Sequence, residues 1–164
     1  MNNKVRFRKP VKQDAKYIYE LIKNSPPLDL NSVYYYLIFC THFAETGIVA
    51  EIENQITGFI SGYLKPDNHD TLFIWQVVVS KKARGNKIGG NMLSELLNRK
   101  ALSNINYVET TVTPSNKSSK AMFQAFAKNV NADIKEEILF EKTSFGNGDH
   151  EDEVLLRIGP FNIN

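Results

Sequence analysis

The sequence has a single cysteine and almost no net charge. One cysteine, Cys40, cannot form a disulfide within the chain, and this fits a reducing compartment. The 20 basic and 18 acidic side chains leave a net charge of +2, which is too balanced for a nucleic-acid-binding surface built on charge. We therefore expect a cytoplasmic protein without a nucleic-acid partner.

Long apolar runs are also missing. The longest are the size of strands, such as Leu72–Val79 (LFIWQVVV), whereas a helix that spans a bilayer needs about 20 residues. The first ten residues lack the apolar core of a signal peptide. We expect no membrane partner, and the length of 164 residues predicts one domain over residues 1–164.

The spacing of apolar residues predicts the element order β-α-α-β-β-β-α-β-α-β-β. Residues 5–8 alternate as a half-buried strand does, while Ala15, Ile18 and Ile22 have helical spacing. Thr71–Ser80 carries no charge and predicts a central strand that is buried on both faces. The fold class is therefore α/β, without the regular alternation of a doubly wound nucleotide-binding fold.

The stretch Ser80–Leu93 (SKKARGNKIGGNML) follows this strand and opens a helix that we expect to begin at Gly89 or Gly90. A helix N-terminus presents unpaired N–H groups, and glycines allow the backbone to approach an anion closely. These features indicate a pyrophosphate site. They are equally compatible with an ordinary polar turn between a strand and a helix, and spacing alone leaves both interpretations open.

Two motifs resemble those of the GNAT acetyltransferases. Arg84 and Gly89 match the acyl-CoA-binding turn of that family, but Lys87 stands where the family has a middle glycine. A later helix opens with Asn116 and Ser119 in the family pattern. It then has Phe123, where a tyrosine commonly protonates the departing thiolate.

The resemblance implies the GNAT acyl-CoA N-acyltransferase fold, a mixed, mostly antiparallel sheet flanked by helices, with splayed central strands. It also implies acetyl-CoA as co-substrate, and we expect no metal because the spacing of the histidines matches no ligand pattern. The implied cofactor-binding residues are Val77, Val79, Arg84, Gly85, Asn86, Lys87, Ile88, Gly89, Gly90, Asn116, Ser119 and Phe123.

Four stretches resemble one branch of this family, the diaminobutyrate acetyltransferases of ectoine synthesis. They are Leu28–Thr46, Thr71–Ser80, Ala83–Leu93 and His150–Pro160. The resemblance implies acetyl transfer from acetyl-CoA to the γ-amine of L-2,4-diaminobutyrate by direct attack in a ternary complex. The product would be N4-acetyl-L-2,4-diaminobutyrate, and the enzyme would be a homodimer.

Such a substrate carries two ammonium groups and one carboxylate. Asp29 is the first candidate for binding an ammonium group, Tyr34 could donate to the carboxylate, and Trp75 could form a wall of the pocket. Each also has a purely structural interpretation, as a turn residue for Asp29 and as core residues for the other two. The N–H of Val77 is the expected donor to the oxyanion of the tetrahedral intermediate.

The charged stretch 148–153 (GDHEDE) supplies two further candidates. His150 and Glu153 are the expected substrate contacts and catalytic residues, with Glu153 accepting a proton through water. If the segment were extended, alternation would place these two side chains on opposite faces. A solvated loop is the alternative interpretation.

Other functions are compatible with the same motifs. The chain could acetylate another small diamine, a polyamine or a protein lysine, or it could be a non-catalytic acyl-CoA sensor, as Phe123 and Lys87 would suggest. Cys40 and His42 lie two residues apart on a predicted apolar helix, so we expect packing rather than nucleophilic catalysis. The spacing of the histidines matches no metal-ligand pattern.

Overall fold

The computed structural model describes residues 4–162, and its helices and strands follow the order predicted from the sequence. The elements are β1 (Arg6–Arg8), α1 (Ala15–Lys23), α2 (Val33–His42), β2 (Ile48–Ile52), β3 (Gln55–Lys65), β4 (Asn68–Val79), α3 (Ile88–Leu97), β5 (Tyr107–Val112), α4 (Lys117–Asn129), β6 (Ile134–Phe140) and β7 (Glu153–Ile158). The strands of the described chain are hydrogen-bonded in the order β1-β2-β3-β4-β5-β7-β6. Strands β4 and β5 are parallel, whereas the pairs β1–β2, β2–β3, β5–β7 and β6–β7 are antiparallel.

Contacts within the chain divide it into two units. The first unit combines the chain up to Tyr63 with Trp75–Ser103, and the second combines Leu64–Ile74 with the chain from Asn104 onward. Strands β3 and β4 contribute residues to both units. None of the helices in residues 4–162 is long and apolar enough to cross a membrane.

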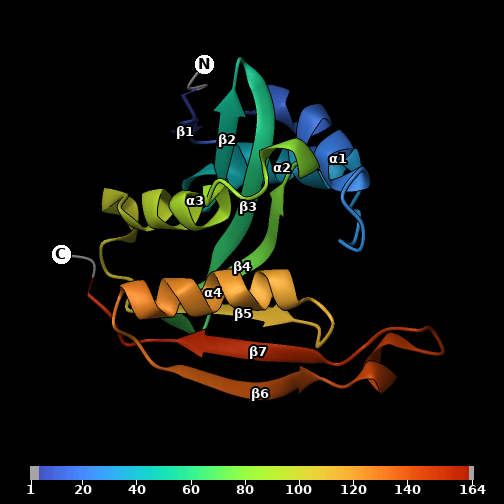
Figure 1. The fold of residues 1–164 in the computed structure, drawn as a ribbon, viewed down its shortest axis with the longest axis vertical. Helices are drawn as coiled ribbons and strands as arrows, with labels where there is room; N and C mark the ends of the chain where they lie inside the picture. Colours follow the sequence, from blue (N-terminus) through green and yellow to red (C-terminus); the bar gives the residue numbers. More distant parts are fainter. Residues whose placement is uncertain (1–3, 163–164) are drawn as a thin grey trace. The chain divides into compact units, whose positions relative to one another are not determined.

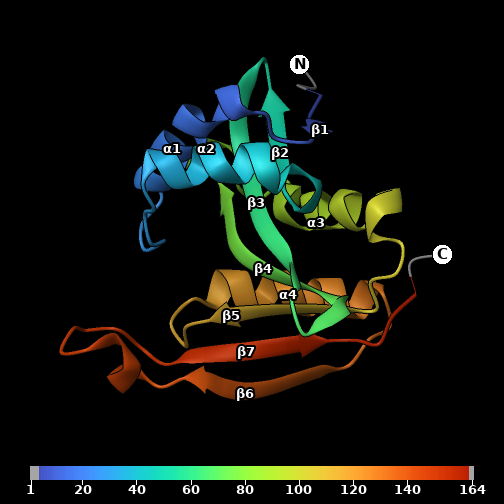
Figure 2. The same ribbon diagram turned by 180° about the vertical axis from the view of Figure 1, so that it is seen from behind.

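In the first unit, helices cover both faces of the strands. Figure 1 shows α3 in front of β2 and β3. Figure 2, which views the protein from behind, shows α2 in front of the same strands. Residues of α1 and α2, including Ile18 and Tyr36, pack with Val49 and Phe59. On the other face, Met92 of α3 lies against Gly58, so closely that a Cβ added there would come within 2.9 Å of the methionine Cε.

Helix α2 begins where a side chain caps it. In the sequence, Asn31 and Ser32 are the two candidates for this cap. The hydroxyl of Ser32 accepts a hydrogen bond from the N–H of Tyr35 at 3.1 Å, so Ser32 is the cap.

A glycine often ends a helix, and from the sequence Gly47 is the expected end of α2, but this expectation is wrong. The helix ends at His42, because the chain then tightens into a 3-10 turn over Ala44–Thr46.

Strand β4 differs from its prediction in one respect. Its pairing with β5 covers Thr71–Ile74, and β4 continues from there to Val79. The expectation that the strand is buried on both faces is wrong, because burial alternates from Leu72 to Val79. Gln76 and Val78 are buried, whereas Trp75 is 53% exposed and Val77 is partly exposed.

In the second unit, α4 runs along β5 in both views (Figures 1 and 2). Its buried face consists of Phe123, Phe126 and Ala127, and the ring of Phe126 meets that of Phe161 edge to face. Glu109 of β5 is buried and forms ion pairs with Lys65 and Arg157. A buried carboxylate is thus paired with two cations.

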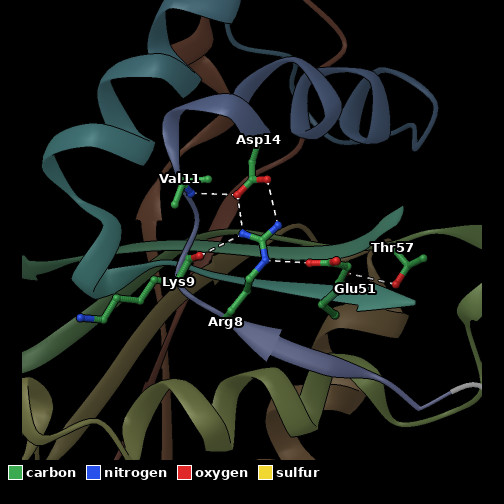
Figure 3. Close-up of polar contacts among 7 residues, drawn as sticks. Arg8, Lys9, Val11, Asp14, Glu51 and Thr57 are labelled. Atoms are coloured by element: carbon green, nitrogen blue, oxygen red, sulfur yellow. Dashed lines mark hydrogen bonds and ion pairs between the residues drawn. The ribbon is translucent and has the colours of Figure 1, made fainter. Parts of the chain in front are cut away.

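Arg8 joins β1 to β2 and to the turn before α1. Its guanidinium donates two hydrogen bonds to Asp14, at 2.7 and 3.0 Å, and one to Glu51 at 2.7 Å (Figure 3). Asp14 also accepts from the N–H of Val11 at 2.8 Å. The hydrogen bond to Asp14 is the largest cause that raises the pKa of Arg8 above its usual value, so this side chain remains cationic.

Replacing Arg8 with methionine should lower the free energy of unfolding by about 3 kcal/mol, because two largely buried carboxylates lose their shared cation. Lys9→Met is the matched control, since Lys9 pairs with Glu45 at the surface and such pairs contribute about 1 kcal/mol or less. Urea unfolding of both variants measures the difference. Equal losses of stability would contradict the role given to Arg8.

Candidate functional site

The turn between β4 and α3 has a left-handed backbone at two positions. Gly85 has φ +84°, a conformation that glycine adopts without strain. Lys87 has φ 56° and ψ 19°, so a lysine takes the left-handed conformation in which a glycine is usual. The lysine in place of the middle glycine is therefore accommodated by the backbone.

Helix α3 begins at Ile88, one residue before the first predicted start, and no side chain caps its N-terminus. The first N–H groups of a helix have no partner within it, and the helix dipole favours an anion there. A Cβ added to Gly90 would meet no atom within 4 Å. The start of α3 therefore offers backbone donors beside open space, which suits a phosphate group.

Side chains of the turn hold it against the end of β4. The Nε–H of Arg84 donates to the carbonyl oxygen of Val79 at 3.1 Å, and the amide of Asn86 donates to the carbonyl oxygen of Ala83 at 3.2 Å. Arg84, Gly85, Asn86 and Lys87 are all exposed. The predicted cofactor residues of the first unit thus form one continuous segment of chain, from Val77 to Gly90.

An aromatic cluster surrounds the exposed ring of Trp75. The ring of Tyr35 meets it edge to face, with centroids 5.1 Å apart, and that of Tyr63 does so at 6.5 Å. Burial raises the pKa of Tyr35 to about 12, so its hydroxyl remains protonated. Tyr34 is 71% exposed and Asp29 is exposed in the loop before α2, so neither is a core residue.

The opening of α4 supplies the remaining predicted cofactor residues. Asn116 caps the helix, with its side-chain oxygen accepting from the N–H of Ser119 at 3.2 Å. The ring of Phe123 is 1% exposed and belongs to the buried face of α4. Phe123 has no proton to donate, and its ring packs within the unit.

His150 and Glu153 lie close together in the second unit. The Nε2 atom of His150 is 3.7 Å from a carboxylate oxygen of Glu153. Residues 150–152 precede β7 and lie outside any strand. The two side chains approach each other, although alternation along a fully extended segment would place them on opposite faces.

The contacts of His150 fix which nitrogen carries the proton. Its Nδ1 atom lies 2.6 Å from the carbonyl oxygen of Glu151, and a carbonyl can only accept a hydrogen bond. Nδ1 therefore carries a hydrogen, and the neutral ring has its lone pair on Nε2, which faces Glu153. The ring of Phe145 stacks on the imidazole, with centroids 3.7 Å apart, and Glu151 bonds Ser115. The imidazole is thus held on several sides.

Cys40 is buried, and burial raises the pKa of its thiol to about 12. A thiol that remains protonated is a poor nucleophile, which agrees with the expected packing role. His42 is exposed at the end of α2. Over residues 4–162, no three His, Cys, Asp or Glu side chains gather in a way that could hold a metal ion.

Sequence reasoning missed three contributors. Tyr35 and Tyr63 were not singled out, although one lies beside Tyr34 and both flank the exposed tryptophan. Phe145, which stacks on His150, ends the 3-10 turn Lys142–Phe145, where nothing in the sequence indicates a contact.

Comparison with known proteins gives consistent matches over nearly the whole chain. The model of the acetyltransferase (GNAT) family matches residues 15–127. The L-2,4-diaminobutyric acid acetyltransferase of Vibrio parahaemolyticus is 48% identical over 153 residues, 93% of this chain and 84% of that protein. The enzyme of the same name from Bordetella parapertussis is 44% identical over 156 residues, 94% of this chain and 84% of that protein.

A solved structure is similar over nearly its full length. It is the diaminobutyrate acetyltransferase from Paenibacillus lautus, in complex with its substrate L-2,4-diaminobutyric acid and coenzyme A. Its TM-score with this chain is 0.95 at 38% identity, and the match covers 98% of this chain and 97% of that one.

Proposed function

The chain belongs to the GNAT acetyltransferase family, and we infer that it transfers an acetyl group from acetyl-CoA to the γ-amine of L-2,4-diaminobutyrate. The observation that carries this conclusion is the 38 to 48% identity with diaminobutyrate acetyltransferases over at least 93% of the chain. The product is N4-acetyl-L-2,4-diaminobutyrate, which places the enzyme in ectoine synthesis.

Because acetyl-CoA is a cytoplasmic metabolite, we propose that the enzyme works in the cytoplasm, and cell fractionation tests this.

The turn before α3 is the proposed site for the pyrophosphate of acetyl-CoA. The uncapped N–H groups of α3 would donate to its oxygens, and the open space at Gly90 allows close approach. Val77 and Val79 lie beyond the stretch of β4 that pairs with β5, and their main-chain groups would bind the pantetheine arm. The N–H of Val77 is the proposed donor to the oxyanion.

The reaction requires a neutral amine. An alkyl ammonium with a pKa near about 10 must lose a proton before its nitrogen attacks the thioester carbon. We propose that Glu153 binds the γ-ammonium and receives its proton through water. The lone pair on Nε2 of His150 faces the carboxylate of Glu153 and is a second proposed proton acceptor. The C–N bond then forms, the C–S bond breaks and CoA leaves as a thiolate. Since a thiol is far more acidic than an amine, this leaving group depends less on an acid at the position of Phe123.

In the first unit, Asp29, Tyr34 and Trp75 are the proposed substrate-binding residues. Asp29 would bind the α-ammonium, and the exposed ring of Trp75 would form a wall that favours a cation. Tyr34 would donate to the carboxylate. Aromatic packing against Tyr35 and Tyr63 holds the Trp75 ring in place.

Selective turnover tests the proposed activity. With acetyl-CoA, release of free thiol should be fastest with diaminobutyrate, and kcat/KM for ornithine should be lower by at least about tenfold, because one extra methylene misplaces the amine. Lysine, putrescine and a histone-tail peptide complete the panel. If any of these amines is turned over faster than diaminobutyrate, that amine is the substrate and the proposal is wrong. CoA binding without turnover of any amine would indicate an acyl-CoA sensor instead.

The site residues are tested by substitutions that preserve size. Asp29→Asn, His150→Gln and Glu153→Gln should each lower kcat/KM for diaminobutyrate by about a hundredfold, because binding or proton acceptance is lost. The affinity for CoA, measured by calorimetry, should remain that of the unmodified protein. His42→Gln is the control, since His42 lies exposed outside both clusters. Full activity in the three variants would overturn the roles proposed for these residues.

We also propose that the enzyme is a homodimer. Strand β6 lies at the end of the strand order and exposes Ile138, Leu139 and Phe140, and the nearby Phe145 is also exposed. Such an apolar edge strand is usually covered, and a second copy would cover the loop that carries His150.

Sedimentation velocity should give a dimer for the unmodified protein and a monomer for Phe140→Lys combined with Ile138→Lys. Val11→Lys, which changes an exposed apolar residue of the first unit, should remain dimeric. A monomer without any substitution would refute the dimer, and a dimer that survives the double substitution would refute this surface.

A further inference from the structure

Gln76 lies between Trp75 and Val77 in β4 and points to the opposite face. Its side chain is buried, and its amide nitrogen donates to the carbonyl oxygen of Asp29 at 2.7 Å. Its amide oxygen accepts from the hydroxyl of Tyr36 at 3.2 Å. Because a carbonyl can only accept, the amide nitrogen must face Asp29, and the orientation of the amide group is fixed.

Tyr36 continues this connection back to the same loop. Its hydroxyl donates to Gln76 and accepts from the N–H of Asn31 at 3.4 Å. The side chain is fully buried, and burial is the main cause that raises the pKa of Tyr36, so the hydroxyl keeps the proton that it donates. Asp29, Asn31, Tyr36 and Gln76 thus form a closed ring of hydrogen bonds and chain.

The loop depends on these two side chains. In the described structure, the hydrogen bonds to the backbone of residues 29–31 come from Gln76 and Tyr36. The side chains of Asp29 and Leu30 are exposed, so they add little packing. A buried amide beside an apolar cluster is costly unless it is fully bonded, and here its partners are the loop and the tyrosine that also bonds the loop.

We infer that Gln76 is a positioning residue, which fixes the backbone of Asp29 from inside the unit and thereby sets the affinity for the diamino acid. The inference rests on the proposed function of Asp29. It implies that one strand carries both the exposed wall at Trp75 and, at the next residue, the buried anchor of the loop. Gln76 itself would not touch the substrate.

Hydrogen exchange tests the anchor without any assay of activity. In Gln76→Met and in Tyr36→Phe, the amides of residues 28–32 should exchange faster by roughly tenfold, because one buried hydrogen bond is lost. Tyr19→Phe is the matched control, since the Tyr19 ring packs on Tyr36 at 6.5 Å but takes no part in the bonded ring. Unchanged exchange in both variants, relative to Tyr19→Phe, would overturn the anchor even if the protein acetylates no diaminobutyrate.

Kinetics then test whether Gln76 acts through Asp29. Gln76→Met should raise KM for diaminobutyrate by roughly tenfold, with a much smaller change in kcat and an unchanged affinity for CoA. In a protein that already carries Asp29→Ala, the same substitution should have almost no further effect. If the two effects instead multiply in full, or if CoA affinity falls as much as that for diaminobutyrate, Gln76 supports the fold in general and the inference is wrong. If the unmodified protein does not acetylate diaminobutyrate, the proposed function fails, and hydrogen exchange still tests the anchor.

Discussion

The alternation of side chains along β4 is the constraint on which the proposed site depends. Successive residues of a strand point to opposite faces, so Trp75 and Val77 share the partly exposed side while Gln76 and Val78 are buried. The strand is therefore anchored in the core and still presents an aromatic ring on its other side. Its pairing with β5 covers Thr71–Ile74, while the alternation of burial runs from Leu72 to Val79.

Each unit, taken by itself, contains candidate residues for part of the chemistry. The first unit has the uncapped start of α3, the exposed Asp29 and the aromatic cluster at Trp75, which suit an anionic cofactor and a cationic substrate. The second has the pair of His150 and Glu153, whose tautomer and separation suit the acceptance of a proton. An ionic network at Arg8 stabilises the strands of the first unit, and one at Glu109 stabilises those of the second. Neither network includes a proposed site residue.

Much of the fold could be predicted from the sequence, because apolar periodicity specifies helices and strands directly. The order of elements and the cap at Ser32 are confirmed. The burial of β4 was predicted wrongly, because a charge-free run conceals that its tryptophan is exposed. The site was harder to predict: the approach of His150 to Glu153 runs against the alternation of an extended segment, and the proposed role of Gln76 depends on a loop 47 residues away in the chain. Neither contact leaves a local pattern in the sequence.

The position of the new amide bond tests the central claim most directly. Diaminobutyrate labelled with ¹⁵N at both amines, incubated with acetyl-CoA and the protein, can be followed by NMR. The account predicts an acetyl group on the γ-nitrogen alone. Acetylation of the α-nitrogen, or an unchanged substrate in a protein that binds CoA, would contradict it.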